Sequence, residues 1–167
     1  MRILVLSDSH GNLTFARQCL NTWKPDRVIH LGDHYRDALC LQAENPVIPW
    51  DVVVGNCDRY SADPFASELL CYPIGGAIFF MTHGHQHGVK SGLSRFLSDA
   101  RAHSAAIALY GHTHHADCYR ESDGMWILNP GTCGGYCATA GIVDLQNGKI
   151  SACRIISQAE TDAHETA

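Results

Sequence analysis

The chain has 167 residues, of which 46% are hydrophobic and 17% are charged, and its formal net charge is -5 at neutral pH. A chain of this length can bury a sizeable hydrophobic core as one domain, and it is too short to form two domains that each bury such a core. The 12 lysine and arginine residues are scattered and form no basic stripe, so we expect no nucleic-acid polymer as partner. No segment is apolar enough to span a bilayer, and we expect no membrane partner.

The first half of the chain predicts strands that alternate with helices. Apolar residues at helical spacing predict a helix from Leu13 to Trp23 with Asn12 at its N-cap, and a second helix over Asp37–Glu44. Three short apolar runs are typical of buried strands in a mostly parallel sheet, namely residues 2–7, 27–32 and 51–55.

The second half of the chain is richer in strands. A helix over 92–103 separates two strands at 68–74 and 77–82 from another at 105–111. Two hairpins follow, one pairing 118–122 with 125–129 and one pairing 140–145 with 149–156 around an Asn-Gly turn.

This order of elements predicts an α/β fold in which two mixed β-sheets pack face to face and are flanked by helices. The sequence has no internal repeat and no linker. We therefore expect one domain over residues 1–157, followed by a flexible tail over residues 158–167.

Residue types that bind metal ions follow five of the apolar runs. In open α/β sheets ligands bind beyond the carboxyl ends of the strands, so we expect these residues to meet at one sheet edge. An aspartate after a strand is often only a turn former, and the His-rich loop at 111–115 could bind metal adventitiously. The coincidence at five strand ends instead favours a metal centre. Its predicted ligands are Asp8, His10, Asp33, Asn56, His83, His112 and His114.

The ligand types are sufficient for two ions. Asp33 follows Gly32, whose backbone freedom permits close approach, and an aspartate there can bridge two cations with its two oxygens. Asn56 can offer a neutral amide oxygen, and the four histidines offer imidazole nitrogens. The imidazole-rich set suits Mn, Fe, Zn, Ni or Co better than Mg.

The eight cysteines include no CxxC pair. The first predicted strand begins at Arg2, which leaves no room for a signal peptide, so we expect a cytoplasmic protein. Its cysteines should then be reduced, and most should be small buried hydrophobic residues. Cys57, next to Asn56, is the exception.

Five motifs occur in order along the chain, namely DSH at 8–10, GD at 32–33, GNCD at 55–58, HGH at 83–85 and GHTH at 111–114. Together they resemble the motifs of the calcineurin-like metallophosphoesterase superfamily. The short chain and the third motif are most similar to its small bacterial and archaeal phosphodiesterase branch. The resemblance implies a four-layer αββα sandwich. It also implies that Asp8, His10 and His114 hold one ion, that Asn56, His83 and His112 hold another, and that Asp33 bridges them.

The function implied by the resemblance is a metal-dependent phosphoesterase. We expect a phosphodiesterase that hydrolyses small phosphodiesters through a hydroxide bridging two divalent ions, with manganese favoured. The ions outweigh the charges of Asp8, Asp33 and the hydroxide, so the pocket should attract a small phosphate ester. A phosphomonoesterase with the same core is the nearest alternative, and a scaffold protein of this fold, like the retromer subunit, is another. The sequence leaves a homo-oligomer open.

One position departs from the family pattern. Many members carry histidine where this chain has Cys57, and a thiol does not readily replace histidine as the acid that protonates the leaving group. Asp58 is expected to orient a ligand, and His85 could serve the chemistry. The predicted catalytic residues are Asp33, Asn56, Asp58 and His85.

Four further residues near the motifs have less specific roles. His87 and His115 fit solvated loops better than a catalytic role. Arg36 and Arg59 follow metal motifs and could contact phosphate, although surface positions suit them equally.

Overall fold

The computed structural model describes residues 1–58 and 63–165, whose strands form two five-stranded sheets. In spatial order, sheet A contains β10 (Lys149–Ser157), β9 (Thr139–Gln146), β1 (Arg2–Leu6), β2 (Arg27–His30) and β3 (Trp50–Val52). Sheet B contains β4 (Leu69–Ile74), β5 (Ala77–Thr82), β6 (Ile107–Leu109), β8 (Trp126–Asn129) and β7 (Asp117–Arg120).

Both sheets are mixed. In sheet A, β1, β2 and β3 are parallel, while β9 and β10 run antiparallel to their neighbours. In sheet B, β5, β6 and β8 are parallel, and β4 and β7 form antiparallel edges. The predicted strand–helix alternation therefore gives the parallel strands of sheet A, of which β3 is an edge, and the antiparallel hairpins supply the other three edges.

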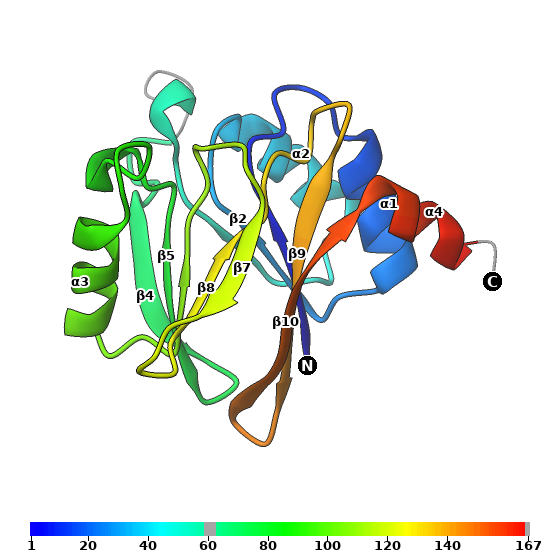
Figure 1. Ribbon diagram of the computed structural model, residues 1–167. Helices are drawn as coiled ribbons and strands as arrows, with labels where there is room; N and C mark the ends of the chain where they lie inside the picture. Colours follow the sequence, from blue (N-terminus) through cyan, green and yellow to red (C-terminus); the bar gives the residue numbers. More distant parts are fainter. Residues whose placement is uncertain (59–62, 166–167) are drawn as a thin grey trace.

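Within the described residues, four α-helices flank the two sheets, which confirms the predicted α/β sandwich. They are α1 (Thr14–Trp23), α2 (Tyr35–Glu44), α3 (Ser94–Ala102) and α4 (Gln158–Glu165). Figure 1 shows α3 on the outer side of sheet B, with α1 and α4 on the opposite side of the molecule. Among the described residues, none of these helices is long and apolar enough to cross a membrane.

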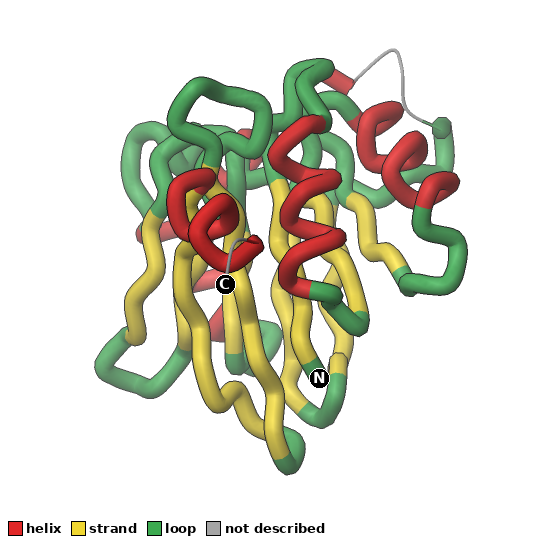
Figure 2. The backbone as a smooth tube through the Cα atoms, turned by 90° about the vertical axis from the view of Figure 1, so that its right-hand side faces the viewer, coloured by secondary structure: helices red, strands yellow, loops and turns green. Residues whose placement is uncertain are grey.

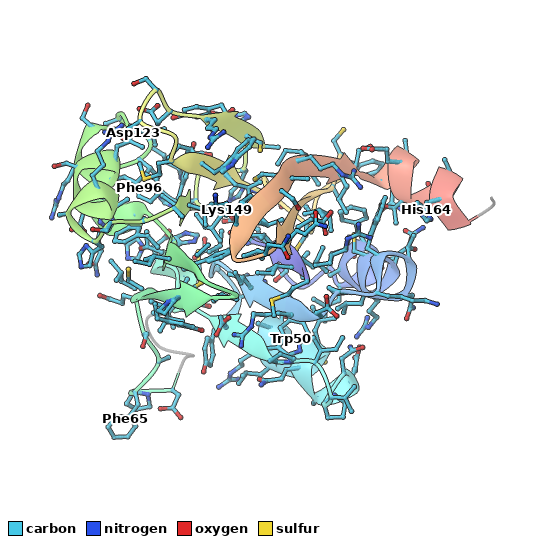
Figure 3. All side chains as sticks on the ribbon, turned by 90° about the horizontal axis from the view of Figure 1, so that it is seen from below. Trp50, Phe65, Phe96, Asp123, Lys149 and His164 are labelled. Carbon is cyan, nitrogen blue, oxygen red and sulfur yellow. The ribbon has the colours of Figure 1, made fainter. Side chains whose placement is uncertain are left out.

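Alternating side chains on the strands create three apolar layers. Ile3 and Val5 of β1 face the layer between the sheets, where they join Phe79 of β5. Leu4 of β1 instead belongs to the layer beneath α1 and α2. On sheet B, Phe80 packs with Phe96 of α3, which Figure 3 places between that helix and the strands. The layer between the sheets fixes them relative to each other, and the two outer layers hold the helices against the sheets.

Several predicted boundaries shift, and two of the shifts lie next to predicted ligands. The third strand ends at Val52 instead of Gly55, so residues 53–55 form the loop that leads into the Asn56 region. Helix α1 begins at Thr14 with Leu13 as N-cap, and the Oδ1 atom of Asn12 accepts a hydrogen bond from the Thr14 N–H at 3.2 Å. The helix thus begins one residue later than predicted, and Asn12 lies one residue before the N-cap instead of being the N-cap itself.

Residues 158–165, which we expected in a flexible tail, form α4. The helix packs against α1, as Figure 2 shows. The indole Nε1 of Trp23 donates to the Oγ1 atom of fully buried Thr161 at 3.3 Å, and the His164 ring lies 4.6 Å from the Trp23 ring. The tail prediction failed because this polar segment gains its partner from the distant helix α1.

All eight cysteines are free, as expected, but few of them are core residues. Only Cys19 and Cys133 are buried. The expectation of mostly buried cysteines is therefore wrong, since three are exposed and three are partly buried. The exposed ones are Cys40, Cys57 and Cys137, and the partly buried ones are Cys71, Cys118 and Cys153.

Candidate metal centre

The seven predicted ligands meet, but they come from two sheets. Asp8 and His10 follow β1, Asp33 follows β2 and Asn56 follows the loop after β3, all in sheet A. The other three ligands come from sheet B. The expectation of one sheet edge is therefore wrong, because the face-to-face packing brings the ends of β5 and β6 to the ends of β1 and β2. The sheet B ligands are His83 after β5 and His112 and His114 after β6.

The first cluster contains Asp8, His10, Asp33 and His114, whose donor atoms lie within 4.8 Å of one another. The Nε2 atom of His114 is 3.3 Å from Nε2 of His10 and 3.1 Å from Oδ1 of Asp8. Asp8 is fully buried, and its Oδ1 atom has no hydrogen-bond partner within the described part of the chain. A buried carboxylate oxygen without a donor is costly, so this cluster fits a cation.

The second cluster contains Asp33, His83 and His112. The Nε2 atom of His83 lies 3.5 Å from Oδ1 of Asp33 and 3.2 Å from Oδ1 of Asn56. Its Nδ1 lies 2.8 Å from the Leu31 carbonyl oxygen, which can only accept a hydrogen bond. Nδ1 can thus donate to this carbonyl, and Nε2 is the ring nitrogen that faces the cluster, as in metal-binding histidines. Asp33 belongs to both clusters.

Five of the ligands adopt left-handed backbone conformations, with φ values of 55° at Asp8, 47° at His10, 54° at Asp33, 67° at His112 and 61° at His114. Such conformations cost residues other than glycine a free energy of order 1–3 kcal/mol, and strained residues of this kind concentrate at functional sites. The backbone thus turns at these five residues, and the turns direct their side chains toward the two clusters.

Two glycines make room for the aspartates. A Cβ atom on Gly55 would lie 2.1 Å from Oδ1 of Asp33, and one on Gly111 would lie 2.1 Å from Oγ of Ser7. Gly32 has a φ of 93°, and its Cβ would approach the Gly55 nitrogen to 2.6 Å. Each of the three positions therefore excludes a side chain. The sequence predicted this need for close approach at Gly32, and the structure adds Gly55 and Gly111.

Asp58 lies behind the clusters and is buried. Its Oδ1 atom accepts a hydrogen bond from the Tyr35 N–H at 2.7 Å, and its Oδ2 atom accepts one from the Gly55 N–H at 2.9 Å. Asp58 thus joins the loop of Asp33 to the loop of Asn56, which fits an orienting role.

Asp37 is a supporting residue that the sequence analysis missed. Its Oδ2 atom accepts hydrogen bonds from Oγ of Ser9 at 2.7 Å and from the Gly11 N–H at 2.8 Å, on either side of His10. The available signal was an acidic residue in the first turn of the helix that follows the GD motif. Asp37 thereby fixes the loop that carries His10.

The electrostatics favour deprotonated ligands. Burial, His83 and Lys90 lower the pKa of His112 to about 4. Burial works against ionised Asp33, but the hydrogen bond from the Cys57 N–H and the nearby His83 outweigh it and lower the pKa of Asp33. Neutral imidazoles and carboxylate anions are the forms that bind metals.

Cys57 and His85 lie beside the second cluster. Loss of hydration and the Asp33 carboxylate raise the pKa of Cys57 to about 11, so the thiol stays protonated at neutral pH. The His85 ring lies 5.5 Å from the His83 ring, and its buried Nδ1 has no partner among the described residues. His85 and Asn56 line a cavity of about 1070 Å³. This cavity gives the centre an access route for a ligand.

The other candidates lie away from the clusters or cannot be placed. Nε2 of His87 is 3.0 Å from an oxygen of Asp99 on α3. His115 and Arg36 are exposed, and Arg59 lies outside the described residues.

Comparison with known proteins agrees with this geometry. Residues 1–148 match the calcineurin-like phosphoesterase superfamily domain. A probable metallophosphoesterase of Bacillus subtilis is 34% identical over 137 residues, covering 79% of this chain and 75% of that protein. A phosphodiesterase of Methanocaldococcus jannaschii is 27% identical over 168 residues, covering 87% of this chain and 94% of that protein.

Among solved structures, zinc-complexed vacuolar protein sorting 29 from Entamoeba histolytica superposes with a TM-score of 0.71 at 19% identity. The alignment covers 94% of this chain and 99% of that protein, and at this identity it reports the fold alone. The match over residues 1–148 and the relative at 34% identity establish the family. The chain belongs to the calcineurin-like phosphoesterase superfamily.

Proposed function

We propose that this protein is a phosphodiesterase that hydrolyses small phosphodiesters with two divalent metal ions, preferably manganese. The observation that carries the proposal is the position of Asp33, whose carboxylate belongs to both donor clusters. One carboxylate with two oxygens can serve two ions at once. Bound ions would lower the pKa of a water toward neutrality and stabilise charge on the phosphoryl oxygens.

The chain's own residues prepare this chemistry. Asp8, Asp33 and the four histidines would hold the ions, while Asn56 would add an amide oxygen next to His83. Asp37 and Asp58 hold the ligand loops through backbone N–H groups. His85 lines the cavity and is placed to contact the ester.

The cavity beside the centre favours a diester over a monoester. Its described lining includes Asp58, Asp63 and Glu68 but no lysine or arginine. At neutral pH a phosphodiester carries one negative charge, whereas a phosphomonoester carries nearly two. Repulsion by the acidic lining therefore penalises the monoester more. The relative from Methanocaldococcus jannaschii that is named a phosphodiesterase supports the same choice.

A direct test combines metal analysis with two model substrates. We expect untagged protein to contain divalent metal and to hydrolyse bis-p-nitrophenyl phosphate faster than p-nitrophenyl phosphate, with the highest rate in manganese. Faster hydrolysis of the monoester would establish the phosphomonoesterase alternative. Protein that neither retains metal nor acts on either ester with added manganese would favour the scaffold alternative.

We also propose a cytoplasmic setting and a small phosphate ester as the partner molecule. Eight free cysteines, three of them exposed, suit a reducing compartment. The net charge of -5 argues against a nucleic-acid polymer.

A further inference from the structure

Two cysteines from different sheets face each other at the seam between the sheets. The Sγ atoms of Cys118 and Cys153 lie 3.3 Å apart and are joined by a thiol hydrogen bond. Cys118 belongs to β7 and Cys153 to β10, and both pack against the apolar layer between the sheets. Residues 35 positions apart in the sequence are thus brought into direct sulfur contact.

The surrounding structure permits these sulfurs to come closer. A disulfide requires a separation of about 2.05 Å, so the pair must approach by roughly 1.2 Å. Both β7 and β10 are edge strands, each paired on one side only within its sheet. Figure 1 shows the two strands next to each other, where β10 packs against β7. Edge strands can accommodate such a shift more easily than central strands.

We propose that Cys118 and Cys153 form a reversible disulfide that links the two sheets, made by exchange with a small-molecule disulfide such as oxidised glutathione. The Cys118 thiolate attacks the small disulfide, forms a mixed disulfide and releases one thiolate. The Cys153 thiol loses its proton to solvent and attacks the Cys118 sulfur, which releases the second thiolate. Two protein thiols are oxidised, and one small disulfide is reduced to two thiols.

The local chemistry assigns the order of the two sulfurs. Contact with Cys153 lowers the pKa of Cys118, whereas the same contact and burial raise the pKa of Cys153. The thiolate is the nucleophile in exchange, so Cys118 attacks first. Cys153 is then already in contact with the sulfur that it must attack.

The link would constrain the part of the chain that closes the metal centre. The segment between the two cysteines includes β8, β9 and Thr132, whose Oγ1 atom donates to the Asp8 carbonyl at 2.7 Å. Closing this segment restricts the unfolded chain. The oxidised protein should therefore melt about 5–10 °C higher than the reduced protein.

The test uses the full-length protein as purified, incubated with graded ratios of oxidised to reduced glutathione and then alkylated. Trypsin cuts after Arg101, Arg120, Lys149 and Arg154, which isolates Cys118 in residues 102–120 and Cys153 in residues 150–154. We expect the cross-linked chain to be about 2 Da lighter than the reduced chain before alkylation and to carry two alkyl groups fewer after it, and we expect a disulfide between these two peptides. Added dithiothreitol should reverse both changes and the rise in melting temperature.

Matched variants make the test specific. Cys118→Ser and Cys153→Ser should each abolish the cross-link and the rise in melting temperature, whereas Cys137→Ser, at an exposed cysteine, should retain both. The wild-type peptide map needs no variant to fold. A stable glutathione adduct on Cys118, a cross-link between other cysteines, or unreacted Cys118 and Cys153 when Cys137 is fully modified would overturn the proposal.

Discussion

His83 and Asp33 belong to different sheets, yet Nε2 of His83 lies 3.5 Å from Oδ1 of Asp33. The centre therefore exists only when sheet A and sheet B are packed together. Sheet A alone would present four of the seven predicted ligands, and sheet B alone would present three. Metal affinity should depend both on the shared carboxylate and on the loops that hold it in place.

Replacing the shared carboxylate should remove the metal-bridging capacity. We expect Asp33→Asn to weaken metal binding by at least about 100-fold, because a neutral amide does not bridge two cations as a carboxylate does. Elemental analysis after chelation and reconstitution measures this loss. Asp117→Asn, at an exposed aspartate, should keep the wild-type metal content. Wild-type metal content in the Asp33 variant would contradict the shared role.

Asp37 should control affinity without touching the ion. We expect Asp37→Ala to weaken metal binding about 10- to 100-fold, because the loop around His10 loses its hydrogen bonds to Asp37. Competition with a coloured chelator gives the affinities. Glu44→Gln on the same helix, where Glu44 pairs with Arg17, is the matched control. Equal affinities for the two variants would exclude a positioning role for Asp37.

A methyl group at Gly55 should disrupt the centre. Its Cβ would lie 2.1 Å from Oδ1 of Asp33, so Gly55→Ala should lower the free energy of unfolding by about 2–3 kcal/mol and impair metal binding. Gly135→Ala places its Cβ no closer than 3.2 Å to Thr132 and should change stability by less than about 0.5 kcal/mol. Urea unfolding of both variants provides the comparison. Equal stability of the two proteins would show that Asp33 can relax away from the added carbon.

Buried His30 should make the protein sensitive to acid. Burial lowers its pKa from 6.5 to about 4, so the unfolded chain takes up a proton that the folded chain resists. The stability from neutral His30 is complete above pH 6.5 and is lost as the pH falls toward 4. The loss should reach about 3 kcal/mol.

The contribution of His30 can be separated from those of other groups. In His30→Asn, the side-chain oxygen can accept the Gly32 N–H bond that Nδ1 of His30 accepts at 3.2 Å. Urea unfolding of chelated protein between pH 7 and pH 4 should therefore show a smaller loss for the variant. Identical pH dependence of the two proteins would refute the assignment.

The chemistry should be sensitive to the leaving group because Cys57 replaces the family's histidine. Activity should fall steeply across aryl phosphodiesters as the leaving phenol becomes more basic. Cys57→His should restore a proton donor and accelerate the most basic substrate by about 100-fold. Cys137→His, at an exposed cysteine elsewhere, should have no such effect. A flat dependence for the wild type, with chemistry limiting the rate, would show that another group already protonates the leaving group.

Much of the fold was predictable from local sequence patterns. The apolar runs around β1, β2, β5 and β6 identify buried strands, because a strand covered on both faces needs apolar residues throughout. Asp8, Asp33 and His83 could be selected as ligands because each directly follows such a run. Local spacing is sufficient for these predictions, since a strand and the loop after it are adjacent in the chain.

Other features depend on contacts between distant segments. The helical state of residues 158–165 depends on Trp23, and the role of Asp37 depends on Ser9 and Gly11. Neither relationship leaves a periodic pattern in the sequence.

The sequence by itself thus determined where most strands and helices follow one another along the chain, and which residues are the predicted metal ligands. Only the tertiary structure decided that the ligands come from two sheets, that Asp33 belongs to both clusters and that Cys118 meets Cys153. The physical reason is that strand formation follows from the local alternation of side chains. The meeting of two sheets depends on how their buried faces pack, which no single segment encodes.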